Sequence, residues 1–402
     1  MKEERRLIKN LPLFPVQMIG SWPRKPEILS EILKATQDDF DQQALDKLVY
    51  PEVKNLVKLE EEIGMDIVGD GELNRDSYAS YVAQRYDGIK LMDMLEFTDY
   101  LGPDCDFAEQ IINNASIKLS AIKNAVCVGK LGFNEGLVVK DLKHLRELTD
   151  KPIKVQLPGP YLLARSIWVP RATQPHYNSQ EELADAIVEL ITQEVQAIQD
   201  IGVEVIQFDE PVLTEVVFSE ESTAERTFMC SSLSEKRSRQ EELEFATGLI
   251  KRVMDSVDRT KSYAALHSCR GNWGTDESAL LSGPYTPLIP TFETIKPDIL
   301  NLEFSVRRAG ELKDLFTSDY LRENIILGLG VVNPRSKLVE RTSNIVLRAK
   351  EALEYIPKER LWLNPDCGFG TFSNSPISSY DMAANKLKAI VQAAQILREE
   401  YQ

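Results

Sequence analysis

Cysteine is scarce in this sequence of 402 residues, which has five, an odd number spread widely along the chain. A disulfide framework needs paired cysteines in a small domain, so this pattern excludes a disulfide-stapled module and suits a reducing compartment. With 43% apolar residues, a chain of this length buries an ample core without cross-links. We expect Cys105, Cys127 and Cys230 to be bystanders, which leaves Cys269 and Cys367 for chemistry.

Long apolar runs are also missing. No stretch approaches the roughly 18 uncharged apolar residues of a membrane span. The opening decapeptide, MKEERRLIKN, is charged where a signal peptide has its apolar core. We therefore expect a cytoplasmic protein that has no membrane partner.

Positive charge is the third shortage, because 47 Lys and Arg stand against 63 Asp and Glu, which gives a formal net charge of −16. Binding of nucleic-acid phosphates requires clustered Lys and Arg, so the composition excludes a general nucleic-acid surface. The basic clusters RRLIK and EKRSR are isolated, which is typical of solvated faces. Small-molecule substrates are favoured.

What the sequence does have is a repeated alternation of short apolar runs and amphipathic stretches. Runs that are buried on both faces read as continuous apolar segments, as in parallel sheets. The count of eight predicts an α/β fold, a (β/α)8 TIM barrel. The runs span residues 16–21, 66–72, 153–160, 203–210, 262–269, 298–305, 324–332 and 360–368.

Helix signals support this pattern. Ser179 with Glu182 predicts a capping box before a long helix, and Gly202 stands where a C-terminal cap belongs. A last helix is expected over about 379–400.

We expect a single barrel domain over 1–402, without a linker or internal repeat. Residues 1–15 are predicted to be an N-terminal extension. The long interval of about 77–150 is predicted to be an insertion at the barrel mouth, with a hairpin around AVCVGKL, and about 212–245 to be helical and polar.

Three run ends carry candidate metal ligands. His267 and Cys269 lie two apart on an extended segment, so their side chains leave the same face and form a chelating pair. Cys367 follows the apolar run LWLN and opens onto the same rim, as does Glu303 after ILNL. Imidazole, thiolate and carboxylate are the donors that zinc prefers, and four candidates suggest that one yields to substrate.

Plainer interpretations of these residues remain open. His267 is equally consistent with a hydrogen-bonded barrel histidine, and Cys269 and Cys367 with small buried apolar residues. The active site of a barrel lies at the carboxyl ends of its strands, where Ser21, Glu72, Asp209 and Glu210 also fall. Glu72 with Asp209 or Glu210 is compatible with the acid/base pair of a hydrolase.

At this point the chain resembles the catalytic half of cobalamin-independent methionine synthase. The motifs follow one another in order along most of the sequence: MIGSWPR, DIVGDGELNRD, IQFDEPVL, LHSC, LEFS, LGLGVV and LWLNPDCGFGT. Members of that family carry a second, non-catalytic barrel before this one, so the chain looks like a short, core-only member.

The resemblance implies a zinc ion held by His267, Cys269, Glu303 and Cys367. It implies homocysteine binding by Ile19, Gly20 and Ser21, by Glu72 and by Asp209, and places Glu215 near the methyl donor. Zinc would stabilise the substrate thiolate, and the thiolate would attack the methyl carbon of the donor.

Two departures from the family pattern concern the donor. Folate-using members read GPGVYDIHS after strand seven, and the histidine is the expected proton donor; this chain has GLGVVNPRS, with Arg335 there. Arginine cannot serve as that acid. The family tryptophan position holds Ser166, with Trp168 two residues on. We expect methyltetrahydrofolate or, since a corrinoid leaving group needs no proton, methylcobalamin, with a corrinoid protein as a candidate partner.

Two alternatives remain. Coenzyme M transferases of the same superfamily activate a thiolate in the same way, but coenzyme M has a sulfonate and no ammonium, so Glu72 and Asp209 favour homocysteine. A non-catalytic barrel with a structural zinc is the other; structural zinc more often sits in compact cysteine-rich knuckles than across three strand ends.

Overall fold

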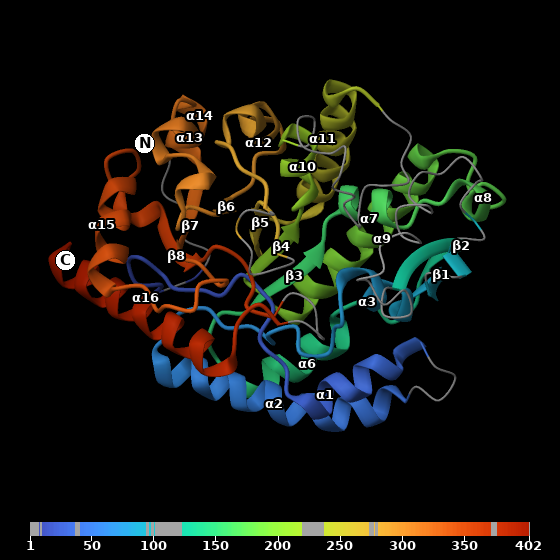
Figure 1. The fold of residues 1–402 in the computed structure, drawn as a ribbon, viewed down its shortest axis with the longest axis horizontal. Helices are drawn as coiled ribbons and strands as arrows, with labels where there is room; N and C mark the ends of the chain where they lie inside the picture. Colours follow the sequence, from blue (N-terminus) through green and yellow to red (C-terminus); the bar gives the residue numbers. More distant parts are fainter. Residues whose placement is uncertain are drawn as a thin grey trace.

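Six parallel strands form the centre of the structure, a computed structural model (Figure 1). They pair in chain order, and all but the first residue of β7 are buried, because the ring interior covers one face and helices cover the other. The strands are β3 (Lys154–Pro158), β4 (Val205–Asp209), β5 (Tyr263–Ser268), β6 (Ile299–Leu302), β7 (Ile326–Val332) and β8 (Leu361–Pro365).

The structure describes residues 8, 10–36, 41–93, 96–97, 100, 123–218, 237–272, 277, 280–370 and 376–401. Cys105 and Cys230, both expected to be bystanders, lie outside these ranges. Within them, no helix combines the length and the apolar character that crossing a membrane requires.

The first two apolar runs of the sequence close the ring without forming regular strands. Val16 makes one parallel bridge to Leu363 of β8, and Val68 makes one to Ile153 beside β3. The N–H of Ile67 donates to the carbonyl oxygen of Val16 at 3.3 Å, which joins the two segments to each other. An eight-membered ring results, of which six members are laddered strands.

The expectation of a regular strand at residues 66–72 is therefore wrong, and the backbone gives the reason. Gly71 and Glu72 both have positive φ values, 64° and 53°, in the left-handed region. A chain that enters this region turns out of the extended conformation. The GDGE sequence ends its run in a tight turn where a strand would have continued.

Helices surround the ring (Figure 1). Two of the predicted helix ends are confirmed: the hydroxyl of Ser179 accepts from the N–H of Glu182 at 3.2 Å, and Gly202 ends that helix with φ 87°. The carboxylate of Glu182 bonds one residue earlier than a capping box requires, to the N–H of Asn178. The bounds are α1 (Pro26–Ile32), α2 (Gln42–Ile63), α3 (Tyr78–Arg85), α6 (Val139–Leu148), α7 (Pro160–Ser166), α8 (Pro170–Thr173), α9 (Gln180–Ile201), α10 (Val212–Phe218), α11 (Arg239–Ser256), α12 (Ile289–Ile295), α13 (Leu312–Leu315), α14 (Asp319–Asn324), α15 (Thr342–Ala352) and α16 (Tyr380–Glu400).

An antiparallel pair lies in the interval between the second run and β3. It consists of β1 (Tyr86–Asp93) and β2 (Lys123–Phe133), which contains the AVCVGKL segment. Glu194 of α9 ties this region to the barrel, since its carboxylate accepts from the N–H groups of Leu137 and Val138 at 2.8 and 2.9 Å.

The interval of about 212–245, expected to be helical and polar, begins with α10 and ends in α11. The expectation of a polar segment is wrong for α10, which is buried at six of its seven positions. Residues 219–236 lie outside the described ranges.

Candidate metal centre

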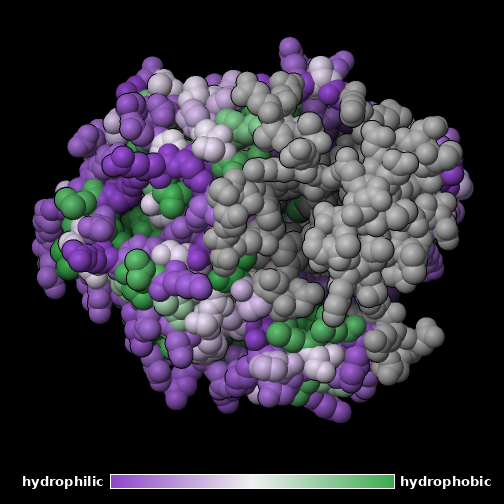
Figure 2. Space-filling view, in the orientation of Figure 1, coloured by the Kyte–Doolittle hydropathy of each residue, from purple (hydrophilic) through white to green (hydrophobic). Residues whose placement is uncertain are grey.

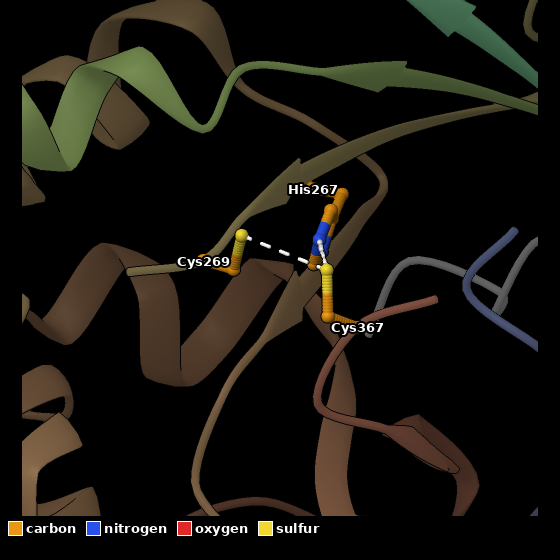
Figure 3. Close-up of side chains that lie close together, drawn as sticks. All are labelled: His267, Cys269 and Cys367. Atoms are coloured by element: carbon orange, nitrogen blue, oxygen red, sulfur yellow. Dashed lines mark hydrogen bonds between the residues drawn. The ribbon is translucent and has the colours of Figure 1, made fainter. Parts of the chain in front are cut away.

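A histidine and two cysteines converge at the carboxyl end of the ring. His267 belongs to β5, Cys269 directly follows it, and Cys367 follows β8. The Sγ atom of Cys367 lies 3.7 Å from Nε2 of His267 and 3.7 Å from Sγ of Cys269 (Figure 3). The three ligand atoms all lie within 4.8 Å of one another. An imidazole and two thiols at this spacing form a possible metal site with the donor types that zinc prefers.

The two thiols of this cluster hold their protons unequally. The hydrogen bond that Cys367 donates lowers the pKa of Cys269, and the nearby His267 adds to the effect. The same bond raises the pKa of Cys367. Because thiolates rather than thiols bind metals, metal binding at this cluster must release the proton of Cys367.

The orientation of His267 is set by the neighbouring strand. Its Nδ1 lies 3.2 Å from the backbone oxygen of Asn301 in β6. A carbonyl oxygen only accepts, so Nδ1 carries the proton and Nε2 offers its lone pair toward Cys367. The Asn301 side chain is itself held, since it donates to Gln207 at 2.8 Å and accepts from Gln17 at 2.9 Å. Sequence reasoning missed Asn301, whose only signal was its place in ILNLEFS.

Glu303, the fourth ligand of the family pattern, does not belong to the three-residue cluster found among the described residues. Its buried carboxylate accepts through Oε1 from Nη2 of Arg335 at 2.9 Å and from Nη2 of Arg308. Its Oε2 accepts from the backbone N–H of Arg270 at 3.0 Å. Three of the four expected ligands are thus together, and the fourth is in ion pairs with arginines.

Arg335, at the position of the family histidine, has a fully buried side chain. Its Nε donates to Glu277 at 3.0 Å and its Nη1 to Asn272 at 3.0 Å. Burial alone would lower the pKa of Arg335, but the charges of Glu303, Asp366 and Glu277 outweigh it and raise that pKa. A guanidinium that stays charged donates hydrogen bonds but gives up no proton.

Asp366 links two of the strand ends at the site. Its Oδ1 accepts from the N–H groups of Phe304 at 3.1 Å and Ser305 at 3.0 Å, just beyond β6. This fixes the position of Cys367 relative to the Glu303 segment. Asp366 was not singled out from the sequence, although it stands directly before the ligand in NPDCG.

Two buried carboxylates, Asp209 at the end of β4 and Glu72 in the turn after the second run, lie at the same end of the ring. Asp209 is the register neighbour of His267. Burial raises the pKa of Glu72 to about 7, and although Arg75 opposes this, the negative charge of Asp209 adds to it. Two buried carboxylates whose charges act on each other suit an ammonium group.

The turn at residues 19–21 packs directly against Glu72. A Cβ atom on Gly20 would lie 2.1 Å from Oε1 of Glu72, so the close approach depends on glycine. The backbone oxygen of Ile19 accepts from Nε2 of Gln207 at 3.1 Å. The hydroxyl of Ser21 accepts from the N–H of Gly370 at 3.3 Å, so the turn lies between Glu72 and the loop after β8.

Glu210 holds the backbone at the start of α7. Its carboxylate accepts from the N–H groups of Tyr161 at 2.8 Å and Leu162 at 3.0 Å, at the start of α7, and burial raises its pKa to about 8. Both oxygens are occupied by backbone donors. Glu210, one of the two carboxylates that a hydrolase could pair with Glu72, is therefore committed to holding the β3–α7 turn.

The two residues expected to contact the donor, Glu215 and Trp168, are both buried. Glu215 is buried in α10, and its negative charge acts on Arg165. Trp168 follows α7, is 2% exposed and packs in the hydrophobic core.

Comparison with known proteins gives matches over nearly the whole chain. The family described as cobalamin-independent synthase, catalytic domain, matches residues 14–396. The chain is similar to the 5-methyltetrahydropteroyltriglutamate–homocysteine methyltransferase of Bacillus velezensis, with 27% identity over 99% of this chain and 45% of that protein. It is also similar to the methionine synthase of Saccharolobus solfataricus, with 25% identity over 98% of this chain and 97% of that protein. The chain thus spans less than half of the bacterial relative and nearly all of the archaeal one.

A solved structure shares the fold. The B12-independent methionine synthase of Shewanella sp. W3-18-1, in complex with selenomethionine, matches with a TM-score of 0.69 and 19% identity, over 96% of this chain and 98% of that one. This likeness confirms the predicted TIM-barrel α/β fold. With the family match over residues 14–396, the chain belongs to the family of cobalamin-independent synthase catalytic domains.

Proposed function

We propose that this protein transfers a methyl group to the sulfur of L-homocysteine and so forms methionine. The observation that carries the proposal is the convergence of His267, Cys269 and Cys367 within 4.8 Å, on strands that also present Asp209. Metal-binding donors beside buried carboxylates suit a substrate with both a thiol and an ammonium group. The printed names of the Bacillus and Saccharolobus relatives support the same activity.

The donor set fits zinc, and we assign the site to that metal, with Glu303 as the fourth ligand that the family pattern implies. When bound, zinc stabilises the thiolate form of a substrate thiol and so supplies a nucleophile at neutral pH. Two side chains of the protein prepare the site: His267, whose Nε2 lone pair the Asn301 carbonyl keeps directed at the metal position, and Cys367, which gives up its proton.

The amino-acid end of the substrate is assigned to the two carboxylates and the turn beside the metal cluster. Glu72 and Asp209 would hold the ammonium group, and the N–H groups and hydroxyl of the 19–21 turn would hold the carboxylate. Anchoring both groups leaves the side-chain sulfur near the cysteine and histidine donors, which lowers the entropic cost of the reaction. Coenzyme M has no ammonium, so the same two carboxylates argue against the rival acceptor.

The identity of the methyl donor is inferred from the residue at the position of the family histidine, Arg335. A pterin leaving group needs a proton at nitrogen, and the buried Arg335 only donates hydrogen bonds to Glu303, Glu277 and Asn272. Trp168, the tentative stacking partner of a pterin, is in the core. These two observations favour a methylcobalamin-type donor, delivered free or by a corrinoid protein, over methyltetrahydrofolate, with Glu215 as a tentative contact.

The test is methionine formation, followed by mass spectrometry. Zinc-loaded protein is incubated with homocysteine and, separately, methyltetrahydrofolate, methylcobalamin or S-methylmethionine. Methionine from methylcobalamin alone supports the proposed donor, whereas methionine from the folate alone would mean that another residue supplies the acid. No methionine from any donor, but methylation of coenzyme M, would reject the proposed acceptor. No methyl transfer to either thiol by folded, zinc-loaded protein would leave a structural zinc as the explanation.

A further inference from the structure

One glutamine joins the two halves of the proposed amino-acid site. Gln207 and Asp209 stand two apart on β4, so their side chains lie on the same face of the strand. Gln207 has no exposed surface, and Asp209 is 1% exposed. Nε2 of Gln207 donates to Oδ1 of Asp209 at 2.7 Å and to the backbone oxygen of Ile19 at 3.1 Å. A single amide thus connects the carboxylate assigned to the ammonium group with the turn assigned to the substrate carboxylate.

The direction of this amide is set by the partners of its oxygen. Oε1 of Gln207 accepts from Nζ of Lys154 at 3.1 Å and from Nδ2 of Asn301 at 2.8 Å. Burial lowers the pKa of Lys154 to about 7, although the charges of Asp209 and Glu72 oppose this, and the amine has N–H groups to donate in either protonation state. A carboxylate only accepts, so the N–H side of the amide faces Asp209. The reverse orientation would place an oxygen against a carboxylate and N–H groups against an amine.

The segment that carries the 19–21 turn depends on these side chains because it has little backbone pairing. It joins β8 through one isolated bridge. Beyond that bridge, the backbone oxygens of Met18 and Ile19 accept from the side chains of Lys154 and Gln207. Buried carbonyl groups need donors, and here β3 and β4 supply them from side chains. A polar network in which every amide position is bonded is rigid, so the turn has a fixed place beside β4.

We propose that Gln207 is a positioning residue for substrate recognition: it holds Asp209 beside the 19–21 turn, sets the separation of the ammonium and carboxylate sites, and so selects a thiol that is an α-amino acid. The inference rests on the proposed function, which places the amino-acid end of the substrate there. An α-amino acid carries both charged groups on one carbon, so it reaches both partners only when their separation is fixed. Gln207 acts through Asp209 and has no part in methyl transfer.

The test measures binding and needs no methyl donor. Isothermal titration calorimetry of the zinc-loaded protein gives the Kd for L-homocysteine and for 4-mercaptobutyrate, which differs from homocysteine only in lacking the ammonium group. The proteins compared are the wild type, Gln207→Met, Asp209→Asn and the double variant Q207M/D209N. Methionine has nearly the volume of glutamine but no N–H group, so Gln207→Met removes the bonds and keeps the space filled.

Gln199→Met is the matched control. Gln199 of α9 is a second buried glutamine whose amide is bonded at both ends. Its Nε2 donates to the backbone oxygen of Asp258 at 2.9 Å, and its Oε1 accepts from the N–H of the same residue at 3.2 Å. Asp258 precedes the start of β5, at the opposite end of that strand from His267. Circular dichroism and thermal unfolding check that each variant is folded.

We expect Gln207→Met to weaken the binding of L-homocysteine about 10-fold, because Asp209 loses a charge-assisted hydrogen bond. The binding of 4-mercaptobutyrate should weaken less than about 3-fold, since only the neutral bond to Ile19 bears on its carboxylate. Asp209→Asn should weaken L-homocysteine about 30-fold. The double variant should bind about as weakly as Asp209→Asn alone, well short of the roughly 300-fold loss that independent effects give. Gln199→Met should lower Tm and leave both Kd values unchanged.

Equal losses for the two thiols, or losses that multiply in the double variant, would show that Gln207 only stabilises the fold and would overturn the inference. If Gln207→Met does not fold, Gln207→Asn replaces it: the amide remains but is one methylene too short to reach both partners, and the same pattern is expected. A wild type that binds L-homocysteine in this pattern but forms no methionine rejects the proposed function and leaves the inference standing. Methionine formation by the wild type with unchanged Kd values in Gln207→Met overturns the inference alone, and no binding of L-homocysteine by the wild type overturns both.

Discussion

The laddered strands and the two closing segments of the ring contribute different chemistry. The parallel ladder of β3–β8 carries the cysteine and histidine cluster, whereas the segments around Val16 and Val68 join the ring through single bridges. These segments carry the 19–21 turn and Glu72. A continuous ladder fixes side chains that must converge on one point, while a turn exposes the N–H groups that a substrate carboxylate needs.

Hydropathy separates the interior of the protein from its outer face. Figure 2 shows a surface that is mostly hydrophilic where residues are coloured, with scattered green side chains. Among the described residues, the exposed large hydrophobics include Leu338 and Leu347. Single exposed apolar side chains of this kind are common on folded proteins and mark no site by themselves.

A substitution in the metal cluster at the end of the ladder should have the strongest effect on activity. Cys367→Ser should remove most zinc affinity and all methyl transfer while the barrel stays folded, because serine is a poor ligand for zinc. Metal analysis measures the zinc content, methionine formation measures the methyl transfer, and circular dichroism checks the fold. Cys127→Ser is the matched control, since Cys127 is buried in β2 and outside the cluster. Full activity in Cys367→Ser would refute the metal assignment.

A substitution in the closing segments should have a smaller effect, on substrate binding. Glu72→Gln should raise the KM for homocysteine about 30-fold, since a hydrogen bond to a charged group contributes about 2 kcal/mol. Zinc content should not change. The control is 3-mercaptopropionate, a thiol acid without the ammonium group, whose KM should be the same in wild type and variant. An equal rise for both thiols would remove Glu72 from ammonium recognition.

Two glycine-to-alanine substitutions, one in the ladder and one in a closing segment, compare the two regions directly. A Cβ on Gly328 in β7 would lie 1.7 Å from Oδ1 of Asn301, a side chain that Gln17 and Gln207 hold in place. Gly328→Ala should therefore lower the free energy of unfolding by about 2 kcal/mol.

Gly20→Ala should behave differently, because its Cβ meets the end of the Glu72 side chain, which can move. We expect a higher KM for homocysteine and a smaller change in Tm than in Gly328→Ala. Thermal unfolding and steady-state kinetics of both variants check this. A larger loss of stability in Gly20→Ala would contradict the distinction between the two regions.

The smallest expected effect is a pH dependence of substrate binding. Burial raises the pKa of Glu72 to about 7, so its carboxylate gains charge as the pH rises through this value. The KM for homocysteine should fall with rising pH, by up to about tenfold per unit below 7, and level off above it. Because burial raises the pKa of Glu72 from 4.5 to about 7, the folding stability of the free protein should fall as the pH rises from about 4.5 to 7 and stay level above 7. A profile that keeps the same inflection in Glu72→Gln would exclude Glu72 as its source.

Part of the fold followed directly from sequence. The six later apolar runs are the strands of the ladder, and the ends of α9 at Ser179 and Gly202 were signalled by their capping residues. Both predictions rest on local rules: parallel strands buried on two faces are continuous apolar runs, and helix ends need specific residues. The second run obeyed the same pattern but bends at Gly71 and Glu72, where a local turn overrides the apolar signal.

The alternation of strands and helices, the barrel class and the residues at the strand ends can all be predicted from local patterns in the sequence. Which of these residues meet depends on how the ring closes. His267, Cys269 and Cys367 converge because the ladder closes, whereas Glu303 contacts Arg308 from its own segment and Arg335 from the loop after β7. The physical reason is that hydrophobic periodicity is a property of neighbouring residues, while the partner of a buried charge is chosen among all segments that reach the same point in space.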